Sequence, residues 1–234
     1  MPTDKPTPVL VPPSEEGSDL LDRFEEVLPG HRELGAALLA RYQEPHRRYH
    51  DVGHLRFVLD QIDALSGRDH DLFVVRLAAW FHDAVYDVPT RELSNEEASA
   101  RLAIRELGRV GLEQEDLGEI SRIIRMTQTH KPGSRDPNGN LLSDADLAVL
   151  AGTPEEYAAY VAAVRAEYAK VSDEDFDRGR FAVLFPLAAS QLFRTGRGHK
   201  LEAAAHTNLD AEIGELADRL GLDLEELDPA SFGA

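Results

Sequence analysis

Apolar residues recur at intervals of three and four along most of this chain, and no segment shows the strict alternation of a half-buried β-strand. Such a repeat places apolar side chains on one face of a helix, and that face must pack against other helices. Proline and glycine interrupt the repeat many times, which favours many separate helices over a few long ones. The pattern therefore predicts an all-α fold built as a multi-helix bundle.

Local start and stop signals refine this prediction. The expected helices lie within residues 34–44, 55–66, 72–83, 94–108, 113–128, 154–168, 173–194 and 200–220. Ser94 and Glu97 predict a capping box, and Pro186 predicts a bend or break in the 173–194 helix. Prolines and glycines in Lys131–Asn140 predict a loop, which a short helix capped by Ser143 would follow.

The chain has 234 residues, of which 42% are hydrophobic, and this is enough for a substantial core. Residues 1–18 contain five prolines and few large side chains, which favours a flexible or extended tail. No linker or internal repeat divides the remainder, so residues 19–234 are expected to form a single domain.

Composition excludes several functions. There is no cysteine, so disulfides, thiolate metal sites and cysteine nucleophiles are ruled out. The formal net charge of −18 argues against nucleic acid or an anionic membrane surface as a partner, because both require clustered cations. No apolar run is long enough to span a membrane, and no secretory signal is recognisable. A cytoplasmic location is expected.

A polar pair, His82-Asp83, ends the apolar run that starts at Leu72. Buried charges need a counter-charge or a metal ion. The chain offers further imidazoles and carboxylates on distant segments: His50, His54, His130, Asp144 and Asp146. Such nitrogen and oxygen ligands indicate a divalent metal site.

The residues alone leave several assignments open. Gly53 favours His50 in a loop and His54 in the first turn of the following helix, yet either histidine can be a simple surface residue. Asp144 fits a helix cap, which makes Asp146 the better ligand candidate. His82-Asp83 can also be a buried hydrogen-bonded pair without metal.

The order of these residues along the chain resembles the motif order of the HD superfamily of metal-dependent phosphohydrolases: His54, then His82-Asp83, then Asp146. The resemblance covers residues 40–215. Within the superfamily, this part of the chain is similar to a bacterial subgroup of predicted metal-dependent HD phosphohydrolases. Its further motifs are Arg48-Tyr-His, Trp80-Phe-His-Asp, Asn95-Glu96, Thr127-Gln-Thr-His130, Arg165-Ala-Glu-Tyr168, Gly179-Arg180 and Asn208-Leu.

The resemblance implies that His54, His82, Asp83 and Asp146 bind one divalent ion. In binuclear members, extra histidines between the His-Asp pair and the last Asp bind a second metal, and here His130 stands alone in that interval. His130 can instead contact substrate phosphate, and His50 and Asp144 are further candidates for metal or substrate contacts. Asp83 is expected to orient the attacking water.

Glu96 resembles an acidic catalytic helper, although it also fits the cap around Ser94. Arg165, Tyr168 and Arg180 are expected to line the substrate pocket, although an ion pair such as Arg180 with Asp177 is an alternative.

The expected activity is hydrolysis of a small phosphate ester or nucleotide-like molecule by a metal-activated water. Two imidazoles favour Mn, Co, Fe, Ni or Zn over Mg. The expected partner is a small anionic phosphorylated substrate, and a homodimer is compatible with the sequence. Two other functions remain open: a di-iron oxygenase on the same fold, and a non-catalytic nucleotide-binding signalling module.

Overall fold

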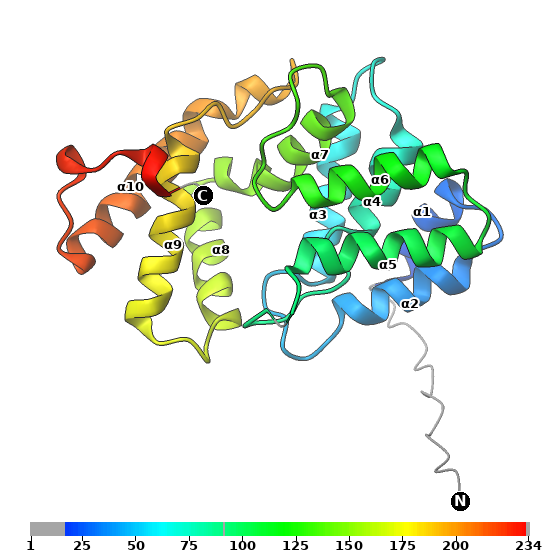
Figure 1. Ribbon diagram of the computed structural model, residues 1–234, viewed down its shortest axis with the longest axis horizontal. Helices are drawn as coiled ribbons and strands as arrows, with labels where there is room; N and C mark the ends of the chain where they lie inside the picture. The colour runs from blue at the N-terminus through cyan, green and yellow to red at the C-terminus, as the bar shows by residue number, and fades with distance from the viewer. Residues whose placement is uncertain (1–16, 91, 233–234) are drawn as a thin grey trace, which may run out of the picture.

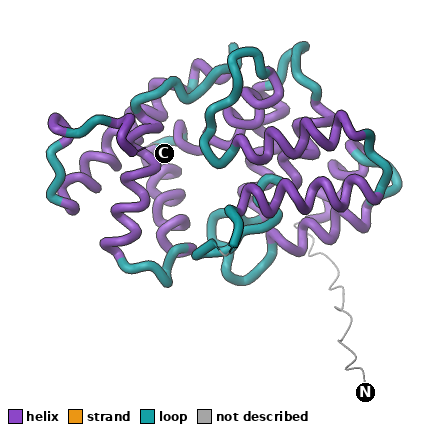
Figure 2. Tube along the Cα trace, viewed as in Figure 1, coloured by secondary structure: helices purple, strands orange, loops and turns teal. Residues whose placement is uncertain are grey.

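The computed structural model describes residues 17–90 and 92–232. Within these ranges the chain forms ten α-helices joined by turns and short 3-10 segments, and none of these residues forms a β-strand (Figures 1 and 2). The all-α prediction is confirmed. The helices are α1 (Ser18–Val27), α2 (Arg32–Tyr42), α3 (Val52–Leu65), α4 (Leu72–Phe81), α5 (Asn95–Arg109), α6 (Gln114–Met126), α7 (Pro137–Leu147), α8 (Pro154–Glu167), α9 (Asp173–Ala188) and α10 (Glu202–Leu220).

Two apolar clusters hold these helices together. The larger contains buried side chains from α1 to α7, and the smaller contains those of α8 to α10 and of the short segment Ala148–Ala151 that follows α7. Phe57 and Leu201 pack against both clusters, so the two groups share a boundary. Figure 1 shows α8, α9 and α10 gathered on one side, with α7 between them and the remaining helices. The single domain over residues 19–234 stays a prediction.

Most helix boundaries follow local signals that the sequence displays. Thr153 and Glu156 form a full capping box at the start of α8, and Pro154 occupies its first turn. Ser94 accepts a hydrogen bond from the Glu97 backbone N–H, as predicted, but the Glu97 carboxylate pairs with Arg101 and Arg125 instead of closing the box.

Three predictions about the elements need correction. Helix α1 was not among the predicted elements. Of the predicted tail, Gly17 and Ser18 form the start of this helix, and residues 1–16 lie outside the described residues. Helix α9 ends at Ala188, two residues after Pro186, and does not continue to residue 194.

The third correction concerns the predicted loop at Lys131–Asn140, because α7 begins at Pro137. The Asp136 carboxylate accepts the Gly139 N–H at 2.9 Å and binds Arg122 through two contacts of 2.7 Å. Any Cβ at position 139 would collide with that carboxylate, which explains the glycine. Pro137 fits the first helical turn, where no backbone donor is needed. Ser143 therefore lies inside the helix and does not cap it.

No helix among the described residues combines the length and apolar character needed to cross a membrane.

Candidate metal centre

Three helix ends position the predicted ligands. The Asp51 side chain accepts the N–H groups of Gly53 and His54, which fixes the start of α3 and places His54 in its first turn. His82 caps the C-terminal end of α4, and Asp83 follows it directly. Asp146 is the second-last residue of α7. The sequence correctly placed His54 in a helical turn and His50 in the loop before it.

The four side chains converge on one small volume. The Nε2 atoms of His54 and His82 lie 3.2 Å apart, and Oδ2 of Asp83 lies 3.3 Å and 3.1 Å from them respectively. Oδ1 of Asp146 lies 3.3 Å from His54 Nε2 and 3.7 Å from His82 Nε2. His54, His82 and Asp146 thus form a group whose geometry can hold a metal ion.

The donor set fits a divalent ion. Ligands at roughly 2.0–2.2 Å from a shared ion lie about 3–3.5 Å from one another, close to the observed separations. His82 Nδ1 lies 2.8 Å from the Ala79 carbonyl oxygen and donates to it, so Nε2 is free to act as a ligand. His54 Nδ1 is buried without a partner among the described residues.

Electrostatics keep both carboxyl groups ionised. Burial opposes their charge, but His82 and neighbouring histidines outweigh it and hold the pKa of Asp83 and of Asp146 well below the ordinary value. Burial lowers the pKa of both histidines, but nearby groups outweigh it together. Asp83, Tyr42 and Asp146 hold the pKa of His82 well above its ordinary value, and Asp146 and Asp83 raise the pKa of His54. The cluster therefore attracts a cation, whether a proton or a metal ion.

His130 lies beside this group. Its Nε2 is 3.6 Å from Oδ2 of Asp146, and its Nδ1 is 3.2 Å from the Ser143 hydroxyl. Burial lowers the pKa of His130, which favours the neutral imidazole. Its backbone φ of +49° lies in the left-handed region, which costs about 1–2 kcal/mol for an L-residue. The structure thus places His130 where it can contact either a metal or a substrate.

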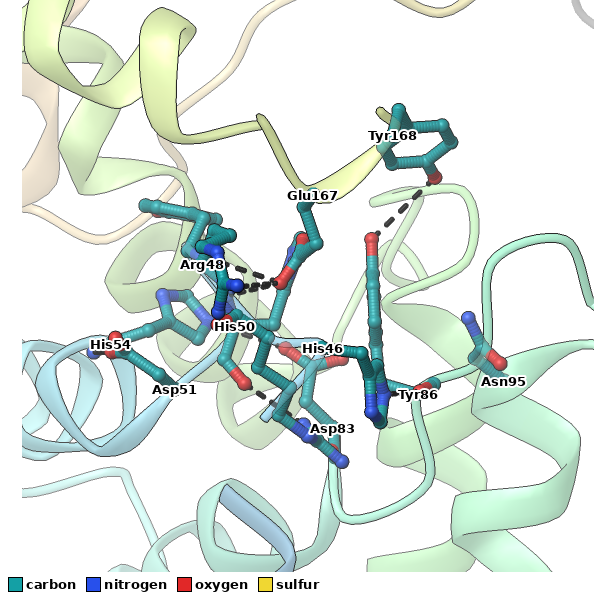
Figure 3. Close-up of polar contacts among 12 residues, drawn as sticks. His46, Arg48, His50, Asp51, His54, Asp83, Tyr86, Asn95, Glu167 and Tyr168 are labelled. Carbon is teal, nitrogen blue, oxygen red and sulfur yellow. Dashed lines mark hydrogen bonds and ion pairs between the residues drawn. The ribbon is translucent and has the colours of Figure 1, made fainter. Parts of the chain in front are cut away.

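Glu167 contacts His50 and the loop around it (Figure 3), and His50 is not part of the metal-binding group. Oε1 of Glu167 accepts the backbone N–H groups of Arg48, Tyr49 and His50 at 3.0, 3.2 and 3.1 Å, and Oε2 lies 2.6 Å from His50 Nδ1. The His50 ring stacks on Tyr86 with 4.0 Å between ring centroids. One carboxylate on α8 therefore organises the whole loop that leads into α3.

Arg47 links that loop to the segment carrying Asp83. Its buried guanidinium donates to the carbonyl oxygens of His50 at 2.8 Å and of Asp83 at 2.7 Å. Two ligand-bearing segments far apart in the sequence are thereby fixed relative to each other.

A cavity of about 480 Å³ opens next to the cluster, and Asp146, His130 and His50 are among the residues that line it. Tyr168 and Arg180, both predicted pocket residues, also line it. Arg180 pairs with Glu212 at 2.8 Å, not with Asp177, which binds Arg219.

Three other predicted residues do not line this cavity. Arg165 donates to the Tyr168 and Val171 carbonyls and pairs with Asp173, so its guanidinium closes the turn between α8 and α9 and is not part of the cavity wall. Glu96 lies in the first turn of α5 and makes no hydrogen bond or ion pair with any described residue, but its carboxylate interacts electrostatically with His130. Its catalytic role stays a prediction.

Asp144 points away from the centre. Its carboxylate accepts the backbone N–H groups of Arg194 and Thr195 at 2.8–3.1 Å, and the residue is fully buried. The predicted helix cap at Asp144 is wrong, because α7 begins seven residues earlier. A ligand role does not fit a carboxylate engaged in this way.

Arg47, Glu167 and the tyrosines at 49, 86 and 160 were missed as site residues. A signal for Glu167 exists: Tyr157, Tyr160, Val164 and Glu167 follow one another at spacings of three, four and three, so a carboxylate occupies the apolar face of α8. No comparable signal marks Arg47.

No family model and no curated protein matches this chain. Among solved structures, the crystal structure of Bacillus subtilis YpgQ in complex with ADP matches with a TM-score of 0.48 and 21% sequence identity, over 80% of this chain and 97% of that one. This similarity is too low to transfer an activity or a ligand.

Proposed function

We propose that this protein is a metal-dependent phosphohydrolase of the HD type, acting on a small phosphate ester or nucleotide-like substrate. The observation that carries the proposal is the convergence of His54, His82, Asp83 and Asp146 beside a cavity of about 480 Å³. These residues occur in the order that the HD superfamily resemblance implies. Asp146 belongs to both the cluster and the cavity wall, so a molecule in the cavity would meet the metal-binding residues directly.

A divalent ion held there would lower the pKa of bound water and polarise a phosphoryl oxygen. The chain's own residues would position the reactants. Both contacts of Asp83 with the imidazoles use Oδ2, which leaves Oδ1 to orient the attacking water. His130 and His50 also line the cavity and would donate hydrogen bonds to phosphate oxygens.

Several further features belong to this proposal. The resident ion would be one of Mn, Co, Fe, Ni or Zn, because imidazole nitrogens suit these metals better than Mg. A second ion would have His130 as its additional ligand. The substrate would be small and anionic, and a homodimer and a cytoplasmic location stay predictions.

The test uses protein stripped with a chelator, reloaded with each metal and assayed for phosphate release from phosphomonoesters and nucleotides. We expect Asp83→Ala and Asp146→Asn to lower turnover at least about a hundredfold. Asp210→Asn, on the exposed face of α10, is the matched control and should behave as wild type. Turnover that survives Asp83→Ala, or that needs no metal, would contradict the proposal.

Two other outcomes would indicate a different function. Two irons per chain with oxygen consumption would indicate an oxygenase. Tight nucleotide binding without turnover under every metal would indicate a signalling module.

A further inference from the structure

The cavity has an apolar wall on the side formed by α8, α9 and the turn between them. Beside the polar residues Tyr160, Tyr168, Asp175 and Arg180, these elements contribute side chains that have no polar atom: Val164, Val171, Phe176, Val183, Leu184 and Leu187. They offer surface that a ligand can bury but no side-chain group that can hydrogen-bond to it.

The polar groups around the cavity are largely engaged with one another. The Tyr160 hydroxyl accepts a hydrogen bond from Arg180 at 2.9 Å, and the Tyr86 and Tyr168 hydroxyls lie 3.5 Å apart (Figure 3). The Asp175 carboxylate accepts the Ser172 hydroxyl at 2.7 Å. A ligand rich in hydroxyl or amide groups would have to share these groups with the partners that they already have.

The charge of the cavity is also limited. Among the described residues that line it, Arg180 is the one lysine or arginine, and its charge is balanced by Glu212 through contacts of 2.8 and 3.1 Å. Asp146 and Asp175 line the same cavity. A polyphosphate would find no further cation along the walls, and the chain's net charge of −18 adds to the repulsion.

We infer that the substrate is a phosphomonoester whose alcohol part is a compact apolar group, aryl or alkyl. The inference rests on the proposed function: the phosphate sits at the cluster and the apolar group lies against the α8–α9 wall. In the reaction the water oxygen forms a new bond to phosphorus and the ester P–O bond breaks. The departing alcohol takes the proton that the water loses, and inorganic phosphate leaves.

The first test compares 2-phenylethyl phosphate with glycerol 1-phosphate on metal-loaded protein. Both leaving groups are primary alcohols, so the comparison isolates the apolar part. We expect kcat/KM to be at least about tenfold higher for the phenylethyl ester, which corresponds to about 1.4 kcal/mol. ATP should be a poorer substrate than the phenylethyl ester. A ratio near or below one, or a preference for ATP, would overturn the inference while leaving the proposed function intact.

Substitutions in the α8–α9 wall test whether this wall causes the preference for the phenylethyl ester. Val183 is 62% exposed, so Val183→Ser should fold, and it should lower the phenylethyl-to-glycerol ratio about twofold. Leu187→Ser, at a half-buried position, should lower it more. Ile104→Ser replaces another exposed aliphatic side chain, on α5 and outside the cavity, and should leave the ratio unchanged. If all three variants had the same phenylethyl-to-glycerol ratio, the assignment of the apolar group to the α8–α9 wall would be wrong.

A binding measurement separates the two proposals. Calorimetry on metal-loaded protein would compare 3-phenylpropylphosphonate with 3-hydroxypropylphosphonate, neither of which has an ester bond to cleave. Tighter binding of the phenyl compound without turnover of any ester would support the cavity assignment and overturn the hydrolase function. Equal binding of the two compounds would overturn the cavity assignment.

Discussion

Removing the Glu167 carboxylate should destabilise the loop before α3 and weaken metal binding. Its two oxygens accept three backbone N–H groups and contact the His50 ring, and the residue is 8% exposed. A single carboxylate oxygen has about two lone-pair sites, so three donors sharing Oε1 amount to roughly two full hydrogen bonds. With the His50 contact the total is about three.

Hydrogen bonds to a charged group contribute about 1.5–3 kcal/mol each. Three at the lower limit amount to about 4–5 kcal/mol, and water entering from the neighbouring cavity would recover part of this. We therefore expect Glu167→Ala to lower the free energy of unfolding by about 3 kcal/mol, a large share of the ~5–15 kcal/mol typical of a folded protein. Glu167→Gln keeps an oxygen for the backbone donors and should lose only about 1–2 kcal/mol.

The same substitution should affect the metal centre, because the loop that Glu167 holds leads directly into the turn carrying His54. Loss of a residue that orients metal ligands typically reduces metal affinity about 10–100-fold. Urea unfolding followed by circular dichroism would give the stability, and calorimetric titration with Mn²⁺ or Zn²⁺ would give the affinity. Glu174→Ala, which removes an exposed partner of Arg178, is the control and should change stability by less than about 0.5 kcal/mol. A loss below about 1 kcal/mol in Glu167→Ala, with unchanged metal affinity, would refute the reasoning.

Three further predictions follow from the same contacts. The pKa of Glu167 is lowered to about 2 from an ordinary value of 4.5, because its hydrogen bonds to His50 and the loop outweigh burial. Its ionised form therefore stabilises the fold fully above about pH 4.5. Urea titrations at stepped pH should show the stability difference between wild type and Glu167→Gln shrinking as the pH falls from 4.5 toward 2. Asp144→Asn should lower the free energy of unfolding by about 1–3 kcal/mol, because two backbone donors lose a charged acceptor, but its metal affinity should stay within about twofold of wild type. Asp146→Asn should abolish metal binding. Equal metal affinities in the two variants would contradict the assignment of Asp146 to the centre. A metal ion at one hundred times its dissociation constant should add about 2.7 kcal/mol to the free energy of unfolding, measured as a higher melting temperature that excess chelator reverses.

Features set by neighbours along the chain were predictable. The apolar repeats located most of the helices, and the Asp51 and Thr153 caps and Pro154 fixed their starts. His54 and the His82-Asp83 pair are positioned by such helix ends, so their placement could be predicted without knowing the tertiary fold.

Features set by long-range contacts were not predictable in the same way. Glu167 meets its backbone partners across 117 to 119 positions of sequence, and Arg47 meets the Asp83 carbonyl across 36. Backbone donors and carbonyl acceptors are present at every non-proline residue, so no side-chain pattern identifies which ones a distant Glu or Arg will bind. The contacts that hold the loop beside the metal centre therefore depend on how α8 packs against the loop before α3.

The start of α7 affects which of its aspartates can reach the metal centre. Ser143 as a helix cap would have placed Asp144 and Asp146 together at a helix mouth, where both carboxylates can face one ion. Because Asp136 provides the cap, both lie inside α7, and residues two apart on a helix point about 200° from each other. One must then face the metal centre and the other the opposite side, where the backbone N–H groups of Arg194 and Thr195 satisfy it. The number of carboxylates available to the metal thus depends on where one helix begins, and that in turn depends on the Asp136–Arg122 pair.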